Sequence, residues 1–126
     1  MNNLSWPADH ERIAQALRRS WSAATSGEWR ADNPACGQCN VTALLLDDVF
    51  GAEILKTPTP NGDHFYNRIG GTRVDFTESQ FSYPLAYRDI AASRMEALAG
   101  TEFDNYAALR SAFVRNLGKG SNDPSQ

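Results

Sequence analysis

The sequence of 126 residues contains no segment that is long and apolar enough to cross a bilayer, and no recognisable leader for export. Its longest apolar stretch, residues 41–46, is interrupted by Thr42, whereas a transmembrane helix needs about 20 apolar residues. The first residues, MNNLSWPADHERI, lack the basic region followed by an apolar region that marks a secretory signal. These absences predict a cytoplasmic protein that does not act at a membrane.

Basic residues are not gathered into a cluster either. The chain has 12 Lys and Arg against 15 Asp and Glu, a formal net charge of −3 and a pI of about 5.3. Domains that bind nucleic acids usually have a clustered positive surface, so nucleic acid is not the expected partner. The length and the 41% of hydrophobic residues are typical of one globular domain. We assign this domain to residues 1–117 and predict a disordered tail over residues 118–126.

Cysteine is scarce, and the two present form a C-x-x-C pattern within NPACGQCNVTALLL, residues 33–46. In a cytoplasmic protein both thiols are expected to be reduced. The spacing fits three interpretations: a redox dithiol, part of a zinc site, or one working thiol with an unimportant neighbour. The surrounding residues have to decide among these three.

The redox and zinc interpretations lack the sequence context that each requires. In the thioredoxin arrangement a buried strand leads directly into the C-x-x-C and its helix, but here the pair follows a polar loop, residues 25–38. A zinc site requires about four ligands. The available donors are Cys36, Cys39 and His64, with His10 or Asp63 as a fourth. We therefore predict no metal and no cofactor, and keep both interpretations as alternatives.

Hydrophobic periodicity predicts an α+β fold. Apolar residues at three- and four-residue steps indicate helices, and alternation on both sides of Gly70-Gly71 indicates a two-residue β-hairpin. The expected order is a helix, a loop, a buried central helix, a small antiparallel sheet and two further helices. The predicted segments are helix 9–24, loop 25–38, helix 39–50 ending at Gly51, strands 53–57, 64–69 and 72–77, and helices 86–98 and 103–117.

Cys39 is the predicted working thiol because it would lie in the first turn of the central helix. There the unpaired backbone N–H groups and the helix dipole favour a thiolate. The backbone N–H of Cys39 and the side-chain amide of Gln38 are candidates for holding an oxyanion. A free cysteine is also commonly an inert core residue, so the assignment depends on the residues that lie beside it.

The hairpin register that follows from the Gly70-Gly71 turn brings His64 and Asp75 together. Tyr66 then faces Asp75 and His64 faces Thr77, so that His64 and Asp75 are diagonal neighbours about 7–8 Å apart at the backbone. An imidazole oriented by a carboxylate is what a cysteine nucleophile requires. A surface ion pair is the alternative explanation. The alternation places Phe65, Ile69, Val74 and Phe76 on one face, and His64, Tyr66, Arg68, Arg73, Asp75 and Thr77 on the other.

These residues resemble the motifs of a known enzyme class. Gly37-Gln38-Cys39 before an apolar helix, the H-x-x-N of residues 64–67 and the D-x-T of residues 75–77 are similar, in this order, to the Cys, His and Asp motifs of the transglutaminase-like branch of papain-like enzymes. The resemblance implies a papain/transglutaminase-like core in which the helix carrying Cys39 packs on a small antiparallel sheet. Because the motifs are close together in the chain, this core would be a shortened one.

A longer resemblance, over about residues 17–81, is to the YunG-like family of small bacterial proteins. The positions that carry it are Trp21, Thr25, Trp29, Asn33-Pro34, Gly37-Gln38-Cys39, Val41-Thr42-Ala43-Leu44, Asp47, Gly51, Glu53-Ile54-Leu55, His64, Asn67-Arg68, Asp75, Thr77 and Gln80-Phe81. The chain departs from the family pattern at Tyr66, where tryptophan is expected, and at Cys36, where an apolar residue is expected. The second departure implies that Cys36 is dispensable.

The sequence therefore predicts a Cys39–His64–Asp75 triad that acts on an amide, ester or isopeptide carbonyl through a thioacyl intermediate. Water as the acceptor would give hydrolysis and an amine would give transamidation, so the predicted class is a cysteine hydrolase or acyltransferase. Tyr66 and Asn67 are expected to shape the site. A catalytically inactive binding module of the same fold is the alternative. The substrate, whether a peptide, a protein or a small amide, and the oligomeric state stay open.

Overall fold

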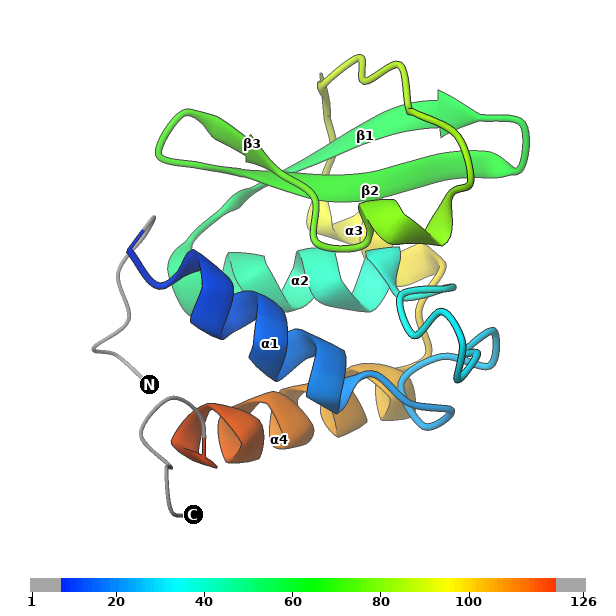
Figure 1. Ribbon diagram of the computed structural model, residues 1–126. Coiled ribbons are helices and arrows are strands. Elements are labelled where there is room, and N and C mark those ends of the chain that lie inside the picture. Colours follow the sequence, from blue (N-terminus) through cyan, green and yellow to red (C-terminus); the bar gives the residue numbers. More distant parts are fainter. Residues whose placement is uncertain (1–7, 120–126) are drawn as a thin grey trace.

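The computed structural model describes residues 8–119 and has the predicted α+β architecture (Figure 1). Its elements are α1 (His10–Ser20), α2 (Cys39–Phe50), β1 (Glu53–Thr59), β2 (Gly62–Ile69), β3 (Thr72–Val74), η1 (Glu78–Gln80), β4 (Ile90–Ala91), α3 (Arg94–Ala99) and α4 (Phe103–Lys119). The predicted tail begins inside α4, and its residues 120–126 lie outside the described part of the chain. Among residues 8–119, no helix combines the length and the apolar character that a membrane crossing requires.

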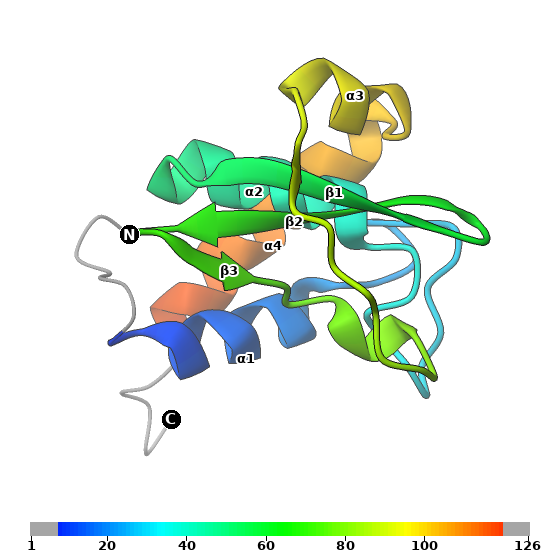
Figure 2. The ribbon, with the colours of Figure 1, turned by 90° about the horizontal axis from the view of Figure 1, so that it is seen from above.

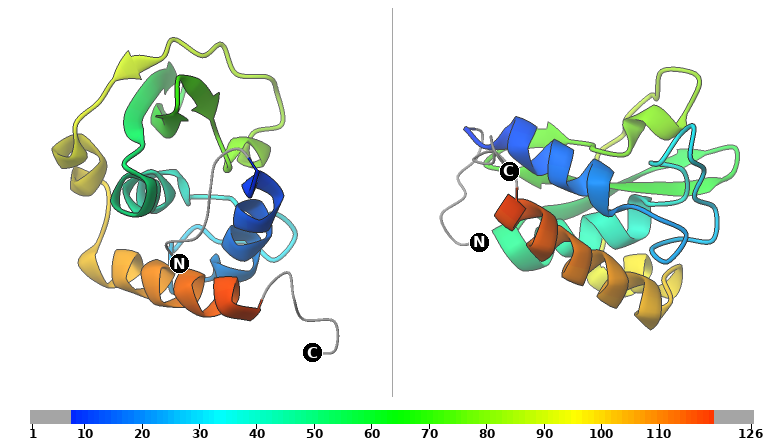
Figure 3. Two further views of the ribbon diagram at one scale, coloured as in Figure 1. Left: turned by 90° about the vertical axis from the view of Figure 1, so that its left-hand side faces the viewer. Right: turned by 60° about the horizontal axis from the view of Figure 1, so that its bottom comes forward.

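Helix α2 lies at the centre of the fold, as its apolar sequence predicts. Figure 3 shows it end-on between the sheet and the helices α1 and α4. Residues 41–46 are all buried, and the Leu44 and Leu45 side chains are 0% exposed. Burial of each such leucine stabilises the fold by about 1.5–3 kcal/mol. The helix ends at Gly51, whose φ of 67° is left-handed, a conformation that glycine adopts without steric cost.

The sheet has the strand order β3-β2-β1-β4, and all its pairs are antiparallel. The predicted register around Gly70-Gly71 is confirmed, since Asn67 pairs with Val74 and Ile69 with Thr72. The predicted division of the hairpin into two faces is also confirmed for the apolar side: Phe65, Ile69 and Val74 are buried in the two clusters that include α2. One face of the sheet therefore rests on the central helix.

The prediction of a strand over residues 72–77 is wrong beyond Val74. The Asp75 side chain accepts hydrogen bonds from the Thr77 backbone N–H and hydroxyl, both at 3.1 Å. This side-chain contact closes a turn of the kind that aspartate favours, and the chain continues into η1. The pairing with β2 consequently stops before Asp75.

The predicted helix over residues 86–98 is also wrong, except for α3 at its end. Residues 82–89, which we call the crossing segment, run across the outer face of the sheet (Figure 2). The Thr57 hydroxyl holds this segment extended, because it donates to the Ala86 carbonyl at 3.1 Å and accepts from the Arg88 N–H at 3.0 Å. Helix α3 starts only after Ser93, whose side chain and Glu96 form a capping box.

Helix α1 ends at Ser20, four residues before the predicted end at residue 24. Trp21 is extended, with a ψ of 135°, and its indole N–H donates to the Thr42 hydroxyl of α2 at 3.0 Å. The chain then leaves the helix because Ser22 and Thr25 close a turn through their side chains. The loop that follows carries the chain to Cys39, as predicted.

Candidate active site

Cys39 and His64 line the same cavity, which has a volume of about 260 Å³. Its walls come from the loop before α2, the turn between β1 and β2, the end of η1 and Gly100 after α3. Cys39 is half-buried, so its thiol is not sealed in the core. The structure therefore brings the predicted nucleophile and the predicted base to one opening on the surface, although they belong to different elements.

Cys39 is the first residue of α2, as predicted. Its backbone N–H is thus one of those that have no acceptor within the helix. The preceding Gly37 has a φ of 76°, and a β-carbon there would lie 2.5 Å from Ser26 Oγ and 2.6 Å from Glu28 Cβ. Glycine at this position allows the loop around Ser26 to lie against the residues that lead into the helix. This close approach is the physical reason for the first residue of Gly37-Gln38-Cys39.

Gly37→Ala is expected to destabilise the protein by about 1–3 kcal/mol and to displace Cys39 from His64. The new methyl group would clash with Ser26 and Glu28, and alanine is strained at the left-handed φ of this position. Gly27→Ala is the matched control in the same loop, since nothing lies within 4 Å of a β-carbon at Gly27. Urea unfolding of both variants measures the difference. Equal stability of the two variants would contradict this role of Gly37.

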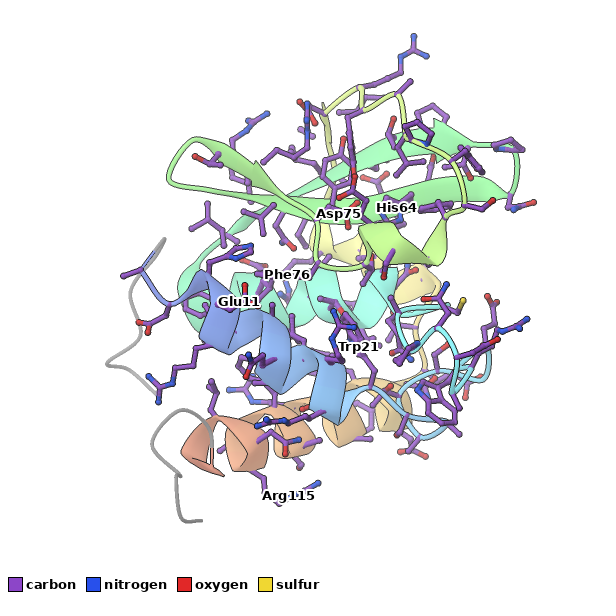
Figure 4. All side chains as sticks on the ribbon, viewed as in Figure 1. Glu11, Trp21, His64, Asp75, Phe76 and Arg115 are labelled. Atoms are coloured by element: carbon purple, nitrogen blue, oxygen red, sulfur yellow. The ribbon has the colours of Figure 1, made fainter. Side chains whose placement is uncertain are left out.

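The predicted contact between His64 and Asp75 is present. His64 Nε2 donates to Asp75 Oδ2 at 2.7 Å, and the two side chains are 1% and 4% exposed. Figure 4 shows both residues side by side near β2 and η1. The alternative of a surface ion pair is wrong, because the pair is buried. Asp75 also accepts from the Tyr87 hydroxyl at 2.8 Å and from Thr77, so that four hydrogen bonds fix its carboxylate.

The other ring nitrogen of His64, Nδ1, is buried and makes no hydrogen bond with another described residue. Burial by itself would lower the pKa of His64, but the hydrogen bond with Asp75 and the nearby Cys39 thiol outweigh it and raise the pKa to about 9. Since Nε2 is occupied by Asp75, Nδ1 is the nitrogen left for exchanging a proton with Cys39. The arrangement fits a cysteine nucleophile with a neighbouring histidine that can exchange a proton with it.

The raised pKa of His64 predicts a specific pH dependence of stability. The folded-state value of about 9 lies above the ordinary value of 6.5, so the stabilisation is complete below pH 6.5 and is lost as the pH rises to 9. We expect a loss of about 3 kcal/mol across this window. NMR titration of His64 and urea unfolding at several pH values measure both effects. The His64→Gln variant should lack this pH dependence, and a His64 titration near 6.5 would contradict the prediction.

Two aromatic rings hold the His64 imidazole in place. Tyr66 stacks on it with 5.7 Å between ring centroids, and Phe81 meets it edge-on at 4.8 Å. The Tyr66 hydroxyl donates to Asp89 at 2.9 Å, which ties β2 to the crossing segment. Tyr66 thus lies where a residue that shapes the site is expected.

Asn67 and Gln38, the two other predicted site residues with amide side chains, point into the interior. Asn67 donates to the Ala43 carbonyl of α2 at 3.1 Å and to the Glu53 carbonyl at 3.3 Å, so it fixes the helix against the sheet. The Gln38 side chain is 0% exposed, and its Oε1 lies 2.7 Å from the Thr25 hydroxyl. Neither side chain lines the cavity, and an oxyanion role for Gln38 stays a prediction.

Sequence reasoning gave no role to two other side chains at the site. Gln80 of η1 lines the cavity, accepts from the Gly37 N–H at 3.4 Å and leaves its buried Nε2 without a hydrogen-bond partner among the described residues. Tyr87 holds Asp75, although the periodicity of residues 86–98 predicts a helix there. Gln80 could have been noticed from the Gln80-Phe81 pair in the family pattern, whereas no sequence signal indicates Tyr87.

The alternatives for the cysteine pair can be compared with the same geometry. Cys36 and Cys39 are both free thiols, and Cys39 follows a loop rather than a strand. Within residues 8–119, no three His, Cys, Asp or Glu side chains are grouped so that they could hold a metal ion. His10, one candidate zinc ligand, instead stacks on Phe76 at 5.1 Å between ring centroids.

Comparison with known proteins identifies the relatives of this chain. The sequence profile of the YunG family, described as "YunG protein", matches residues 9–118. The chain is 44% identical over 107 residues to the Bacillus subtilis (strain 168) protein named "Uncharacterized protein YunG", which covers 85% of this chain and 93% of that protein. No solved structure matches. The chain belongs to the YunG family.

Proposed function

We propose that this protein is a cysteine hydrolase or acyltransferase with a papain/transglutaminase-like arrangement of Cys39, His64 and Asp75. The observation that supports this proposal is the shared cavity: a half-buried thiol at a helix start opens onto the same space as a buried imidazole that a carboxylate orients. The three groups correspond to the nucleophile, base and orienting group of covalent catalysis.

In the first step the S–H proton of Cys39 passes to Nδ1 of His64, and the sulfur attacks the carbonyl carbon of an ester or amide. The new C–S bond forms while the carbonyl π electrons move to oxygen. The imidazolium of His64 then gives its Nδ1 proton to the leaving alcohol or amine, and the C–O or C–N bond breaks to leave a thioester. In the second step water or an amine loses a proton to His64 and attacks the thioester, and the thiolate of Cys39 leaves.

The negative oxygen of the intermediate needs hydrogen-bond donors. The Cys39 N–H at the start of α2 is one donor, and the helix dipole at this end favours negative charge. The Nε2 of Gln80 is a second candidate, because it lacks a partner beside the same cavity. Gln38, the residue before Cys39, contributes less directly: its side chain accepts a hydrogen bond from the Thr25 hydroxyl and so fixes the chain at the start of α2.

Acylation by an activated ester tests this proposal. The protein is incubated with para-nitrophenyl acetate at neutral pH, quenched in acid and digested, and the acetylated peptides are identified by mass spectrometry. The expected result is an acetyl group on Cys39 that forms rapidly and then turns over. Cys36→Ser is the matched control, which should leave this reaction unchanged. Equal acylation of both cysteines would favour a binding module without catalysis.

A further inference from the structure

We infer that the cavity at Cys39 selects substrates that carry a positively charged group, an ammonium or guanidinium, beside the carbonyl to be attacked. This inference rests on the proposed function for the identity of the reacting group. The charge preference itself is a property of the cavity and can be measured without catalysis.

Apart from His64, the charged side chains around the cavity are acidic. Within residues 8–119, none of the cavity-lining residues is a lysine or arginine, whereas Glu28 and Asp63 both line it. The positive charge of a protonated His64 is balanced inside the protein by Asp75, at 2.7 Å. Its Nδ1, buried and without a hydrogen-bond partner among the described residues, is the nitrogen that the proposed function assigns to the Cys39 thiol. The net potential in the opening is therefore negative.

Glu28 is a carboxylate on the wall of the cavity, beside the loop that leads to the nucleophile. Its Oε1 lies 3.3 Å from the position of a β-carbon on Gly37, two residues before Cys39. Glu28 is exposed and takes part in none of the ion pairs formed by the described residues. Its charge is consequently available to a ligand.

Asp63 lines the same cavity from β2 and is only partly neutralised. Lys56 Nζ is 3.8 Å from Asp63, but the same ammonium group makes its close contact with Glu96. One lysine thus serves two carboxylates, and the Asp63 side chain remains 44% exposed. Glu28 therefore presents a free negative charge to a ligand that approaches the thiol, and Asp63 presents a partly compensated one.

The size and polarity of the cavity agree with a single charged group. Its volume of about 260 Å³ lies below the roughly 300–1,000 Å³ that is usual for drug-sized ligands. Asn40, Thr59 and Asn61 supply neutral hydrogen-bonding groups on the same surface. A lysine- or arginine-like side chain next to the scissile carbonyl fits this space better than a large apolar group.

Charged thiol reagents measure the potential at Cys39 directly. In the Cys36→Ser protein, Cys39 is treated with aminoethyl, methyl or sulfonatoethyl methanethiosulfonate, and each rate is divided by that of free cysteine. We expect the cationic reagent to be favoured over the anionic one by about tenfold at low salt. Glu28→Gln and Asp63→Asn, each of which removes one charge with little change in shape, should each reduce the ratio.

The outcomes separate this inference from the proposed function. A cationic-to-anionic rate ratio equal to that of free cysteine would overturn the inference. A ratio that neither Glu28→Gln nor Asp63→Asn lowers would overturn it as well. A cationic preference without any acylation of Cys39 would instead leave the charge selectivity in place and remove the proposed chemistry. As the second arm, para-nitrophenyl esters of a trimethylammonio acid and of its uncharged tert-butyl isostere are compared. Faster acylation by the cationic ester supports the inference, and equal rates contradict it.

Discussion

His64→Ala is expected to slow the acylation of Cys39 by an activated ester about 10²- to 10⁴-fold at neutral pH, the usual contribution of a positioned general acid or base. The effect should be large because Nδ1 of His64 is the nitrogen left free for the thiol once Asp75 occupies Nε2. Stopped-flow release of para-nitrophenolate, with the acetylated peptide identified by mass spectrometry, measures the rate.

The matched control for this variant is His10→Ala, because His10 is the other histidine of the chain and lies on α1 against Phe76. It should leave the rate of Cys39 acylation unchanged. Since His64 is buried, His64→Gln serves as a second variant that fills more of the space. Circular dichroism identifies any variant that fails to fold. If the folded His64 variants acylate Cys39 at the same rate as the protein without a substitution, the imidazole has no part in the mechanism.

Asp75→Ala is expected to lower the free energy of unfolding by about 3–5 kcal/mol at neutral pH. The substitution removes one partner of a buried ion pair, so that His64 must either stay buried as a lone charge or give up the proton that Asp75 stabilises, and breaking such a pair from one side has this cost. It also removes the acceptor for Tyr87 and for Thr77. Urea unfolding followed by tryptophan fluorescence gives the value.

Asp32→Ala is the matched control for this stability change. Asp32 also forms an ion pair, with Arg30 at 3.0 Å, but the two side chains are 70% and 64% exposed. Exposed pairs contribute little, so the expected change is below about 1 kcal/mol. A similar loss in the two variants would mean that burial of the His64–Asp75 pair has no energetic consequence.

The parts of the site that depend on local patterns could be predicted from the sequence. The apolar run after Cys39 and the following Gly51 define α2, and the Gly70-Gly71 turn fixes the hairpin register. Together they place Cys39 at a helix start and His64 beside Asp75. These features follow from the periodicity of helices and strands and from turn chemistry, which act over a few residues.

The remaining parts depend on contacts between distant segments. Tyr87 reaches Asp75 because the crossing segment is held extended by Thr57, 29 residues before Ala86, and this overrides the helical periodicity of residues 86–98. Gln80 meets Gly37 across 43 residues. The interior position of Gln38 likewise depends on Thr25 in a loop. Periodicity and turn motifs report only on residues that are close in the sequence, so they do not predict contacts between segments this far apart.

Selective alkylation of the two cysteines tests the central claim, that His64 activates Cys39, most directly. The protein is treated with iodoacetamide at neutral pH, and the labelling rates of Cys36 and Cys39 are followed by mass spectrometry in the unmodified protein and in His64→Ala. We predict that Cys39 is labelled much faster than Cys36 and that His64→Ala removes the difference. Equal labelling of the two thiols that does not respond to His64 would contradict the account.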